Sequence, residues 1–242
     1  MKCAIMQPTY LPWAGYFNLI NSVDVFVFLD DVQFERRSWQ SRNRIIDNGQ
    51  IQWLTCPTKK ASRDTLIKDI QLLDDSYWQQ QHIKKLRYNY AQAPFFSELQ
   101  PFITLLQNVK VTSLAMLNAQ LIEWLCQHLA INTTFVHAST LGVTGDRSEH
   151  LFQICQSLGA DTYLSPVGSA QYLKEDNVFS NSNVTLSFQN YQPNTYLQQH
   201  SPNRFISHLS IVDVIAHLGF DHTQRYIQGE TVCNPLLSMM SA

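Results

Sequence analysis

The chain lacks the signatures of several large enzyme classes. It contains no GxGxxG or GxxxxGKS/T pattern, so neither the usual dinucleotide-binding loop nor a P-loop is present. It contains no GxSxG elbow, and an α/β-hydrolase is therefore not expected. HxxH, HExxH and paired Cys/His spacings are also missing, so the sequence does not support a structural zinc site.

Long apolar runs and redox-type cysteine pairs are missing as well. No apolar run approaches the roughly 20 residues that a membrane-spanning helix needs, and the N-terminus lacks a basic segment followed by a long apolar stretch. We therefore expect a cytoplasmic protein without a signal peptide and without membrane insertion. The five cysteines include no CxxC spacing, and Cys3, Cys126 and Cys155 lie within apolar runs. Buried, reduced thiols are the expected state of these residues.

Charged residues make up only 15% of the chain, and their charges nearly cancel. There are 17 basic and 19 acidic residues, which gives a formal net charge of −2. This balance does not support a general nucleic-acid binder or a membrane-surface protein, because both need excess positive charge. Any anion site must be local, and the densest basic cluster is Arg36, Arg37, Arg42 and Arg44. We expect a small-molecule substrate, and the sequence leaves the oligomeric state open.

The first part of the chain organises the predicted fold. Two short apolar runs, residues 3–6 and 25–29, flank a loop and an apolar segment at residues 16–20. This pattern predicts strand, loop, helix and strand, and in a parallel α/β unit both strands end at the same edge. Open α/β sheets bind ligands at that edge. The sequence therefore predicts one ligand rim that gathers Gln7, Tyr10, Trp13, Asp30, Asp31 and the arginines.

The later chain predicts a hairpin, a run of helices and further strands. Asn48-Gly49 lies between two β-rich runs, and glycine supplies the positive φ that a tight turn needs. Three helices in a row predict a helical cap inserted at residues 75–130. Strands are predicted over residues 67–73, 134–137, 162–164 and 184–188, and helices over residues 149–158 and 211–218. The predicted fold is α/β, a single domain over residues 1–242 with a parallel, Rossmann-like central sheet, a β-hairpin and the helical cap.

Two positions near the first helix and the second strand are candidate ligand contacts. Gly15 begins the predicted helix, where free backbone N–H groups and the helix dipole favour an anion, unless Gly15 only shapes the turn. Asp30 and Asp31 either contact a ligand hydroxyl or a metal ion, or form salt bridges with nearby arginines. Neighbouring strand residues face opposite sides, so one of the two carboxylates must face away from a given site.

A basic and aromatic cluster follows these carboxylates. Guanidinium groups of Arg36, Arg37 and Arg42 can grip a carboxylate or phosphate at two points. Trp39 can stack on a base or a sugar. The alternative interpretation is a solvated face in which the arginines form internal ion pairs.

Two histidines are candidate proton carriers, because imidazole titrates near neutral pH. His82 lies on one helical stripe with Trp78 and Leu86, which also fits a buried structural histidine. His208 precedes a helix start at Ser210, whose spacing to Asp213 is similar to a capping box, so a capping role is the alternative there. The small-residue loop after the strand at residues 162–164 adds Ser165 to the predicted rim.

Five stretches carry a resemblance to a known family. They are QPTYLPWAGYFNLINSVDVFVFLDDVQFERRSWQSRNRI at residues 7–45, WLTCP at 53–57, YNYAQAP at 88–94, YLSPVGSAQYL at 163–173 and HLSIVDVIAHLG at 208–219. Together they resemble the bacterial WbqC-like family over nearly the whole chain. Members of that family are commonly encoded among genes for O-antigen and other surface polysaccharides. The resemblance implies a part in sugar-nucleotide modification or transfer.

Residues 6–16 also resemble the first loop of the nucleotidylyltransferase superfamily. There a strand is followed by a His-x-Gly-His motif at a helix start, and the two histidines stabilise the transferring phosphoryl group. Gly15 keeps the glycine, whereas Trp13 and Tyr16 stand where the histidines would be. The helix start at Ser210, preceded by Ser207, takes the place of the late Ser/Thr-rich loop that holds phosphates. The resemblance implies a nucleotidylyltransferase-like fold without implying nucleotidyl transfer.

These observations together predict a group-transfer enzyme of bacterial surface-polysaccharide biosynthesis. Its substrate would be nucleotide-linked or acyl-activated, and a nucleotide or nucleotide-sugar, with or without Mg²⁺, is the expected bound group. The alternative is a protein on the same fold that binds a nucleotide-sugar or a partner without turnover. The candidate catalytic residues are His82, His208 and Asp30. The candidate substrate-binding residues are Gln7, Tyr10, Trp13, Gly15, Tyr16, Asp31, Arg36, Arg37, Trp39, Arg42, Ser165 and Ser210.

Overall fold

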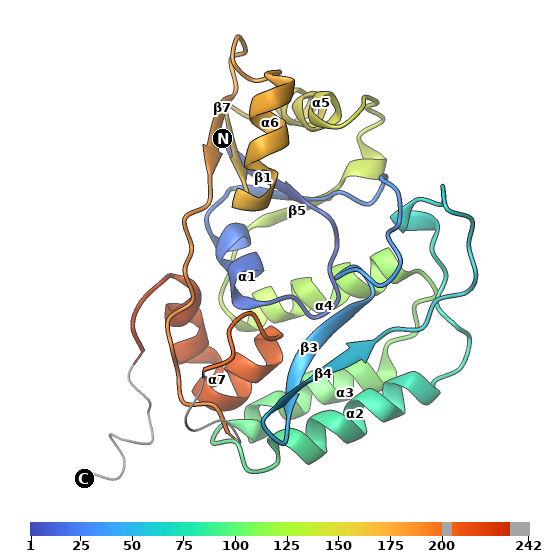
Figure 1. Ribbon diagram of the computed structural model, residues 1–242, viewed down its shortest axis with the longest axis vertical. Helices are drawn as coiled ribbons and strands as arrows, with labels where there is room; N and C mark the ends of the chain where they lie inside the picture. The colour runs from blue at the N-terminus through green and yellow to red at the C-terminus, as the bar shows by residue number, and fades with distance from the viewer. Residues whose placement is uncertain (200–204, 233–242) are drawn as a thin grey trace.

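Five parallel strands form the central sheet of the computed structural model, which describes residues 1–199 and 205–232 (Figure 1). Their order across the sheet is β5-β2-β1-β6-β7. The strands are β1 (Lys2–Met6), β2 (Val25–Phe28), β5 (Thr134–His137), β6 (Thr162–Ser165) and β7 (Thr185–Phe188). The predicted α/β class with a parallel, Rossmann-like central sheet is confirmed.

The two strands near the N-terminus are apolar because helices cover both of their faces. Every residue of β2 is buried, as are the three central residues of β1. β1 pairs with β2 from Cys3 opposite Val25 to Met6 opposite Phe28, so the two strands end side by side. This register delivers the residues that follow β1 and those that follow β2 to the same edge of the sheet.

Helices cover the sheet in two layers, which build two separate cores. The layer against Phe26 and Phe28 contains α1 (Ala14–Asn21), α4 (Leu114–His128) and α7 (Ile211–Ile227). The layer against Val25 and Val27 contains α5 (Ser148–Leu158) and α6 (Ala170–Asp176). The alternation of phenylalanine and valine along β2 therefore sends neighbouring side chains to opposite faces. Figure 1 shows α5 and α6 above the sheet and α1 and α4 below it.

The order of the strands reverses between β1 and β6. The chain moves from β1 to β2 and β5 on one side of the sheet and then to β6 and β7 on the other. Right-handed crossovers place the helices of the two halves on opposite faces. In open α/β sheets, ligands bind in the crevice outside the strand ends at such a reversal. The topology therefore favours a ligand site beyond Met6 and Ser165.

The predicted hairpin is present as β3 (Arg42–Asp47) and β4 (Gln50–Thr55). Asn48 and Gly49 both have positive φ, 48° and 76°, which is the geometry of the tight turns that suit a right-handed strand twist. In Figure 1 the hairpin lies between α4 on one side and α2 (Tyr77–Tyr90) and α3 (Gln100–Asn108) on the other.

The strand predicted over residues 67–73 is wrong. A short 3₁₀-helix, η1 (Ile67–Asp69), stands there, and only isolated β-bridges follow it. The backbone N–H groups of this segment find separate acceptors, because Lys68 bonds to Asp30 and Leu72 bonds to Thr112. Without one continuous partner strand, no ladder can form. Further 3₁₀-helices are η2 (Phe96–Leu99), η3 (Ala138–Thr140) and η4 (Val167–Ser169).

The helix predicted to end at Leu218 continues to Ile227 as α7, with a kink at Gly219. Gly219 has φ of 73°, and a Cβ atom there would lie 2.8 Å from the ring of Phe95. The Glu98 carboxylate accepts a hydrogen bond of 2.7 Å from the backbone N–H of Phe220. Glu98 therefore caps the second half of the helix, and this tertiary cap is why the helix resumes beyond its glycine.

The described cysteines, Cys3, Cys56, Cys126 and Cys155, are buried free thiols, and Cys233 lies outside the described residues. The Sγ atoms of Cys3 and Cys155 lie 3.7 Å apart between β1 and α5. None of the described helices is both long and apolar enough to cross a membrane.

Candidate functional site

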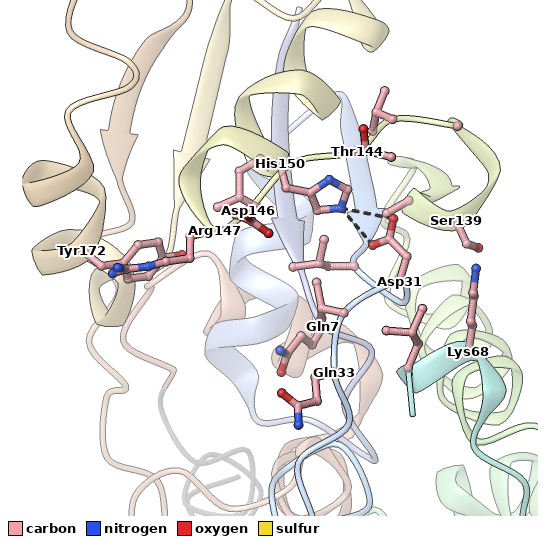
Figure 2. Close-up of a pocket in the computed structure, with 18 residues that line it drawn as sticks. Gln7, Asp31, Gln33, Lys68, Ser139, Thr144, Asp146, Arg147, His150 and Tyr172 are labelled. Carbon is pink, nitrogen blue, oxygen red and sulfur yellow. Dashed lines mark hydrogen bonds and ion pairs between the residues drawn. The ribbon is translucent and has the colours of Figure 1, made fainter. Parts of the chain in front are cut away.

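A cavity of about 900 Å³ opens at the edge of the sheet where β1, β2 and β5 end (Figure 2). Its wall includes Gln7 after β1, Asp31 after β2 and Ser139 after β5. Lys68 lies on one side of the cavity, and Arg147, at the start of α5, lies on the other. We call this space the sheet-edge cavity. It occupies the edge at which the sequence predicts ligand binding.

Two smaller cavities adjoin it. One, of about 260 Å³, lies at the strand-order reversal and is lined by Gln7, Trp39 and Pro166 among others. The other, of about 600 Å³, is lined by Gln7, Arg36 and Arg63 among others. Gln7 belongs to the wall of all three cavities, so a ligand that entered any of them would pass its side chain.

The Gln7 side chain is held in a fixed orientation. Its Oε1 accepts a hydrogen bond of 2.8 Å from Gln40 Nε2, and its backbone carbonyl accepts one of 3.0 Å from the Tyr16 hydroxyl. Gln40 is itself anchored, because Asn118 Nδ2 donates to its carbonyl oxygen over 2.8 Å. With Oε1 engaged by a donor, the Gln7 amide N–H₂ is the part of the group that remains for a ligand acceptor.

Asp31 and His150 form a pair in the wall of the sheet-edge cavity. His150 Nε2 lies 3.1 Å from both carboxylate oxygens of Asp31 (Figure 2). The Nδ1 atom of His150 is buried and has no hydrogen-bond partner among the described residues. His150 therefore donates its Nε2 proton to Asp31 and fixes the orientation of the Asp31 carboxylate in the cavity wall.

The loop before α5 brings the backbone close to this pair. Gly145 has φ of 154°, and a Cβ atom there would lie 2.8 Å from the backbone nitrogen of His150. The guanidinium of Arg147 lies over the Tyr172 ring, 5.7 Å from its centroid, and its Nε lies 3.7 Å from an Asp176 oxygen. Arg147 is thus held beside the open N-terminus of α5, where the helix dipole favours negative charge.

Asp30 points to the opposite face of the sheet from Asp31. One of its oxygens accepts from the backbone N–H of Ser139 at 3.0 Å, and the other contacts His137 Nδ1 at 2.9 Å. Burial raises the pKa of Asp30, but the bonds from His137 and Ser139 outweigh burial and hold this pKa below its ordinary value. The same contact raises the pKa of His137. His137 lines neither the sheet-edge cavity nor the two cavities that adjoin it.

Several sequence-predicted site residues are buried inside the fold. The Tyr10 hydroxyl lies 2.8 Å from His82 Nδ1, and both side chains are buried under the hairpin and α2. Burial raises the pKa of Tyr10 and lowers that of His82 to about 4. The Ser165 hydroxyl bonds to Ser169 Oγ over 2.5 Å. These contacts are within the protein, so the predicted ligand roles of these residues stay predictions.

The start of α1 is covered by an aromatic side chain. A Cβ atom at Gly15 would lie 2.2 Å from ring carbons of Trp13, so Trp13 packs directly on the glycine backbone. Ser210, at the start of α7, lies opposite Trp13 in a β-bridge, and its Oγ accepts from the Val212 N–H at 3.3 Å. The capping role of Ser210 is therefore real. The close packing of Trp13 explains why position 15 is a glycine, without any ligand at the start of α1.

The remaining predicted residues lie along the hairpin. The rings of Trp13 and His208 lie 4.3 Å apart, and His208 O accepts a bond of 3.1 Å from Arg44. The guanidinium of Arg44 lies 5.2 Å from the centroid of Trp39, and Arg42 lies 4.2 Å from that of Trp53. Burial of the imidazole lowers the pKa of His208, and the positive charge of Arg44 lowers it further.

The other two predicted arginines do not share one environment. Arg36 donates to the carbonyl of Ala61, while Arg37 is exposed. Trp13, Asp30 and Arg42, expected at one mouth, do not line a common cavity, because Arg42 lines a cavity that contains neither Trp13 nor Asp30.

The buried state of His82 predicts a pH-dependent stability. Its pKa falls from 6.5 to about 4 in the folded protein. Between pH 4 and pH 6.5 the histidine is therefore more protonated in the unfolded state than in the folded state. Stability should therefore fall by about 3 kcal/mol as the pH drops from 6.5 to 4. Urea unfolding of the protein and of His82→Gln across this range measures the effect. If the free energy of unfolding changed equally with pH in the two proteins, the prediction would be contradicted.

Sequence reasoning missed His150 and Lys68 in the cavity wall and His137 beside Asp30. The two histidines acquire their roles from aspartates that are distant in sequence. The available signal was Gly145-Asp146-Arg147-Ser148 directly before a helix, which is a glycine-containing turn into a helix N-terminus. That pattern is weak by itself, because many helices begin in this way.

A comparison with curated proteins finds a relative whose own name describes it as uncharacterized. The chain is 30% identical over 219 residues to "Uncharacterized protein Rv1507c" of Mycobacterium tuberculosis (strain ATCC 25618 / H37Rv). The match covers 90% of this chain and 94% of that protein. No solved structure matches.

A family comparison confirms the resemblance seen in the sequence. The WbqC-like protein family model matches residues 7–225, which run from the residue after β1 into α7 and include every residue that lines the sheet-edge cavity. The chain belongs to the WbqC-like protein family.

Proposed function

We propose that this protein is a cytoplasmic group-transfer enzyme of bacterial surface-polysaccharide biosynthesis. Membership of the WbqC-like family supports a role in polysaccharide-related biosynthesis. The donor would be a nucleotide-linked or acyl-activated compound, and the acceptor would be a hydroxyl group of a sugar. Both kinds of donor carry phosphate groups, which suits Lys68 and Arg147 in the wall of the sheet-edge cavity.

The observation that carries this proposal is the Asp31 carboxylate, fixed by His150 in the wall of a cavity at the ligand-binding edge of the sheet. A carboxylate in this position can accept the proton of an acceptor hydroxyl. The hydroxyl oxygen then forms a bond to the electrophilic atom of the donor. The donor's phosphate or thiolate leaves with the electron pair of the broken bond.

Positive groups around the cavity would hold the donor. Lys68 and Arg147 stand on opposite sides of Asp31 in Figure 2, and the N-terminus of α5 adds backbone N–H groups. The Gln7 amide can donate to a sugar or phosphate oxygen. A Mg²⁺ ion brought with the donor would be held by the donor phosphates and water, which leaves Asp31 free to accept the proton.

A ligand screen followed by product analysis tests this function. Thermal unfolding is measured with nucleotides, nucleotide-sugars and acyl-CoA compounds, and each compound that stabilises the protein is then incubated with sugar acceptors. A donor at 100 times its dissociation constant should stabilise the fold by about 2.7 kcal/mol. Mass spectrometry should then detect a transferred group. Stabilisation by none of these donor classes would contradict the proposal.

A second function is favoured by one observation. Trp13 and Tyr16 stand at the two positions where the nucleotidylyltransferase superfamily has histidines, and here Trp13 is packed on Gly15 and Tyr16 is buried. A protein that kept the fold and bound a nucleotide-sugar or partner without turnover would show this pattern. Stabilisation by a nucleotide-sugar with no product in any acceptor mixture would support it.

A further inference from the structure

Arginine and tryptophan side chains alternate on the outer face of the hairpin. Arg42 and Arg44 lie two positions apart on β3 and so share a face, and Arg44 pairs directly opposite Trp53 on β4. Arg42 lies over the Trp53 ring, 4.2 Å from its centroid, and Arg44 lies 5.2 Å from that of Trp39. The two indole rings lie 5.2 Å apart. We call Arg42, Trp53, Trp39 and Arg44 the Trp–Arg ladder.

The ladder is open to solvent although its arginines are held in place. Trp39 is 46% exposed and Trp53 is 37% exposed, which is unusual for the largest apolar side chains. The Nε atoms of Arg42 and Arg44 are buried and have no hydrogen-bond partner among the described residues, and the Arg44 guanidinium also donates to the carbonyl of His208. The stacking fixes the guanidinium planes, so each arginine is ordered in advance for a planar anion.

A strongly basic cavity of about 290 Å³ lies beside the ladder. Its wall contains five cationic side chains and no carboxylate, and these are Arg36, Arg37, Arg42, Lys59 and Lys60. Only Lys59 forms a salt bridge among the described residues, to Asp74 at 2.7 Å. In a chain with a net charge of −2, this concentration of unopposed positive charge is local and complementary to a polyanion.

The basic cavity leads toward the sheet-edge cavity. It shares Phe34 and Arg36 with the 600 Å³ cavity, which in turn shares Gln7 and Gln33 with the sheet-edge cavity. Trp39 also lines the cavity at the strand-order reversal. A chain molecule lying on the ladder can therefore extend one end toward Asp31.

We propose that the Trp–Arg ladder and the basic cavity bind an acidic glycan, with sugars that carry carboxylate or phosphate groups, as the acceptor of the transfer. This inference rests on the proposed function, because it assigns the acceptor of that same site. Indole faces stack on the apolar faces of sugar rings, while guanidinium groups take the acidic substituents at two points. The near-neutral charge of the whole chain favours a glycan over a nucleic acid, whose binders carry an extended basic surface.

Titration calorimetry on the full chain tests the ladder with three probes of similar length. They are hexamannuronic acid, the neutral maltohexaose and the single-stranded oligonucleotide dT8. We expect hexamannuronic acid to bind at least about tenfold more tightly than the other two, because loss of charge-assisted bonds costs about a factor of ten or more. Trp53→Ala and, separately, Arg42→Gln should each weaken this binding about tenfold.

Tyr88→Ala is the matched control, because Tyr88 is an exposed aromatic residue on α2 away from the ladder and should not affect binding. Thermal unfolding of all variants shows that each is folded. Tighter binding of dT8, equal binding of maltohexaose, or unchanged binding by both ladder variants would overturn the proposal.

The two proposals fail in different ways. Ladder-dependent glycan binding in a protein that no donor stabilises would overturn the transfer reaction and leave the ladder in place. Turnover of a donor onto a neutral acceptor, with no binding of hexamannuronic acid, would overturn the ladder and leave the transfer reaction in place.

Discussion

Asp31→Asn is expected to lower kcat by about 100-fold to 10,000-fold while leaving donor affinity nearly unchanged, because general-base catalysis contributes about this factor. The amide has the shape of the carboxylate and can still accept a bond from His150 Nε2, but it cannot take the acceptor proton. The measurement is the initial rate with the donor found by the screen, together with the donor dissociation constant from calorimetry. A comparable loss of kcat and of affinity would instead assign Asp31 to substrate binding.

Asp146→Asn is the matched control for this result. Asp146 lines the same cavity and carries the same charge, but it is exposed and forms no salt bridge among the described residues. The control should therefore change the overall charge of the cavity without changing the proton acceptor. If both variants lost activity to the same extent, the effect would come from the electrostatic field and not from Asp31 itself.

Asp213→Ala should destabilise the fold by about 3 to 5 kcal/mol. Asp213 is fully buried, and its two oxygens accept from the Tyr90 hydroxyl at 2.9 Å and the Tyr196 hydroxyl at 2.5 Å. The alanine variant leaves both hydroxyls without an acceptor in a dry interior, and each lost partner costs about 1 to 3 kcal/mol. Tyr90 belongs to α2 and Asp213 to α7, so this carboxylate joins the helical segment to the C-terminal helix.

Urea unfolding measures this effect, with Tyr90→Phe as the control. The phenylalanine variant removes one donor but leaves the Tyr196 bond, so it should cost about 1 to 2 kcal/mol. A smaller loss for Asp213→Ala than for Tyr90→Phe would mean that burying the carboxylate costs more free energy than its hydrogen bonds return. The bond of 2.7 Å from His217 Nδ1 goes to the backbone carbonyl of Asp213, so the alanine variant keeps it.

The elements of the fold that the sequence predicts are those with local signals. β1 and β2 are continuous apolar runs, the hairpin has Asn48-Gly49, and α4 has Ser113 as its N-cap. The segment at residues 67–73 and the continuation of α7 were predicted wrongly. In both cases the hydrogen-bond partners come from distant segments, such as Glu98 for Phe220, and no local pattern carries that information.

The residues of the candidate site also fall into those that a local signal predicts and those that depend on distant partners. Gln7 and Asp31 can be found from the strand ends alone, because the topology of a parallel sheet brings those ends together. The partner of Asp31 is His150, 119 positions further along the chain, and no spacing rule connects them. Trp13, His208 and Arg44 likewise meet only because α7 returns to the hairpin, so their stacking is a product of tertiary packing.

The order of the strands has a consequence for biosynthesis. β1 sits at the centre of the sheet, yet its neighbour β6 pairs Tyr163 with Cys3, which left the ribosome 160 positions earlier. The partner of β2 on its other side, β5, follows 109 positions later, since Thr134 pairs with Val25. A nascent chain must therefore hold two very apolar strands without their outer partners during much of translation, and distant pairings of this kind form slowly. Folding of this protein in the cell should accordingly depend on protection of its first thirty or so residues by chaperones until the last strands emerge.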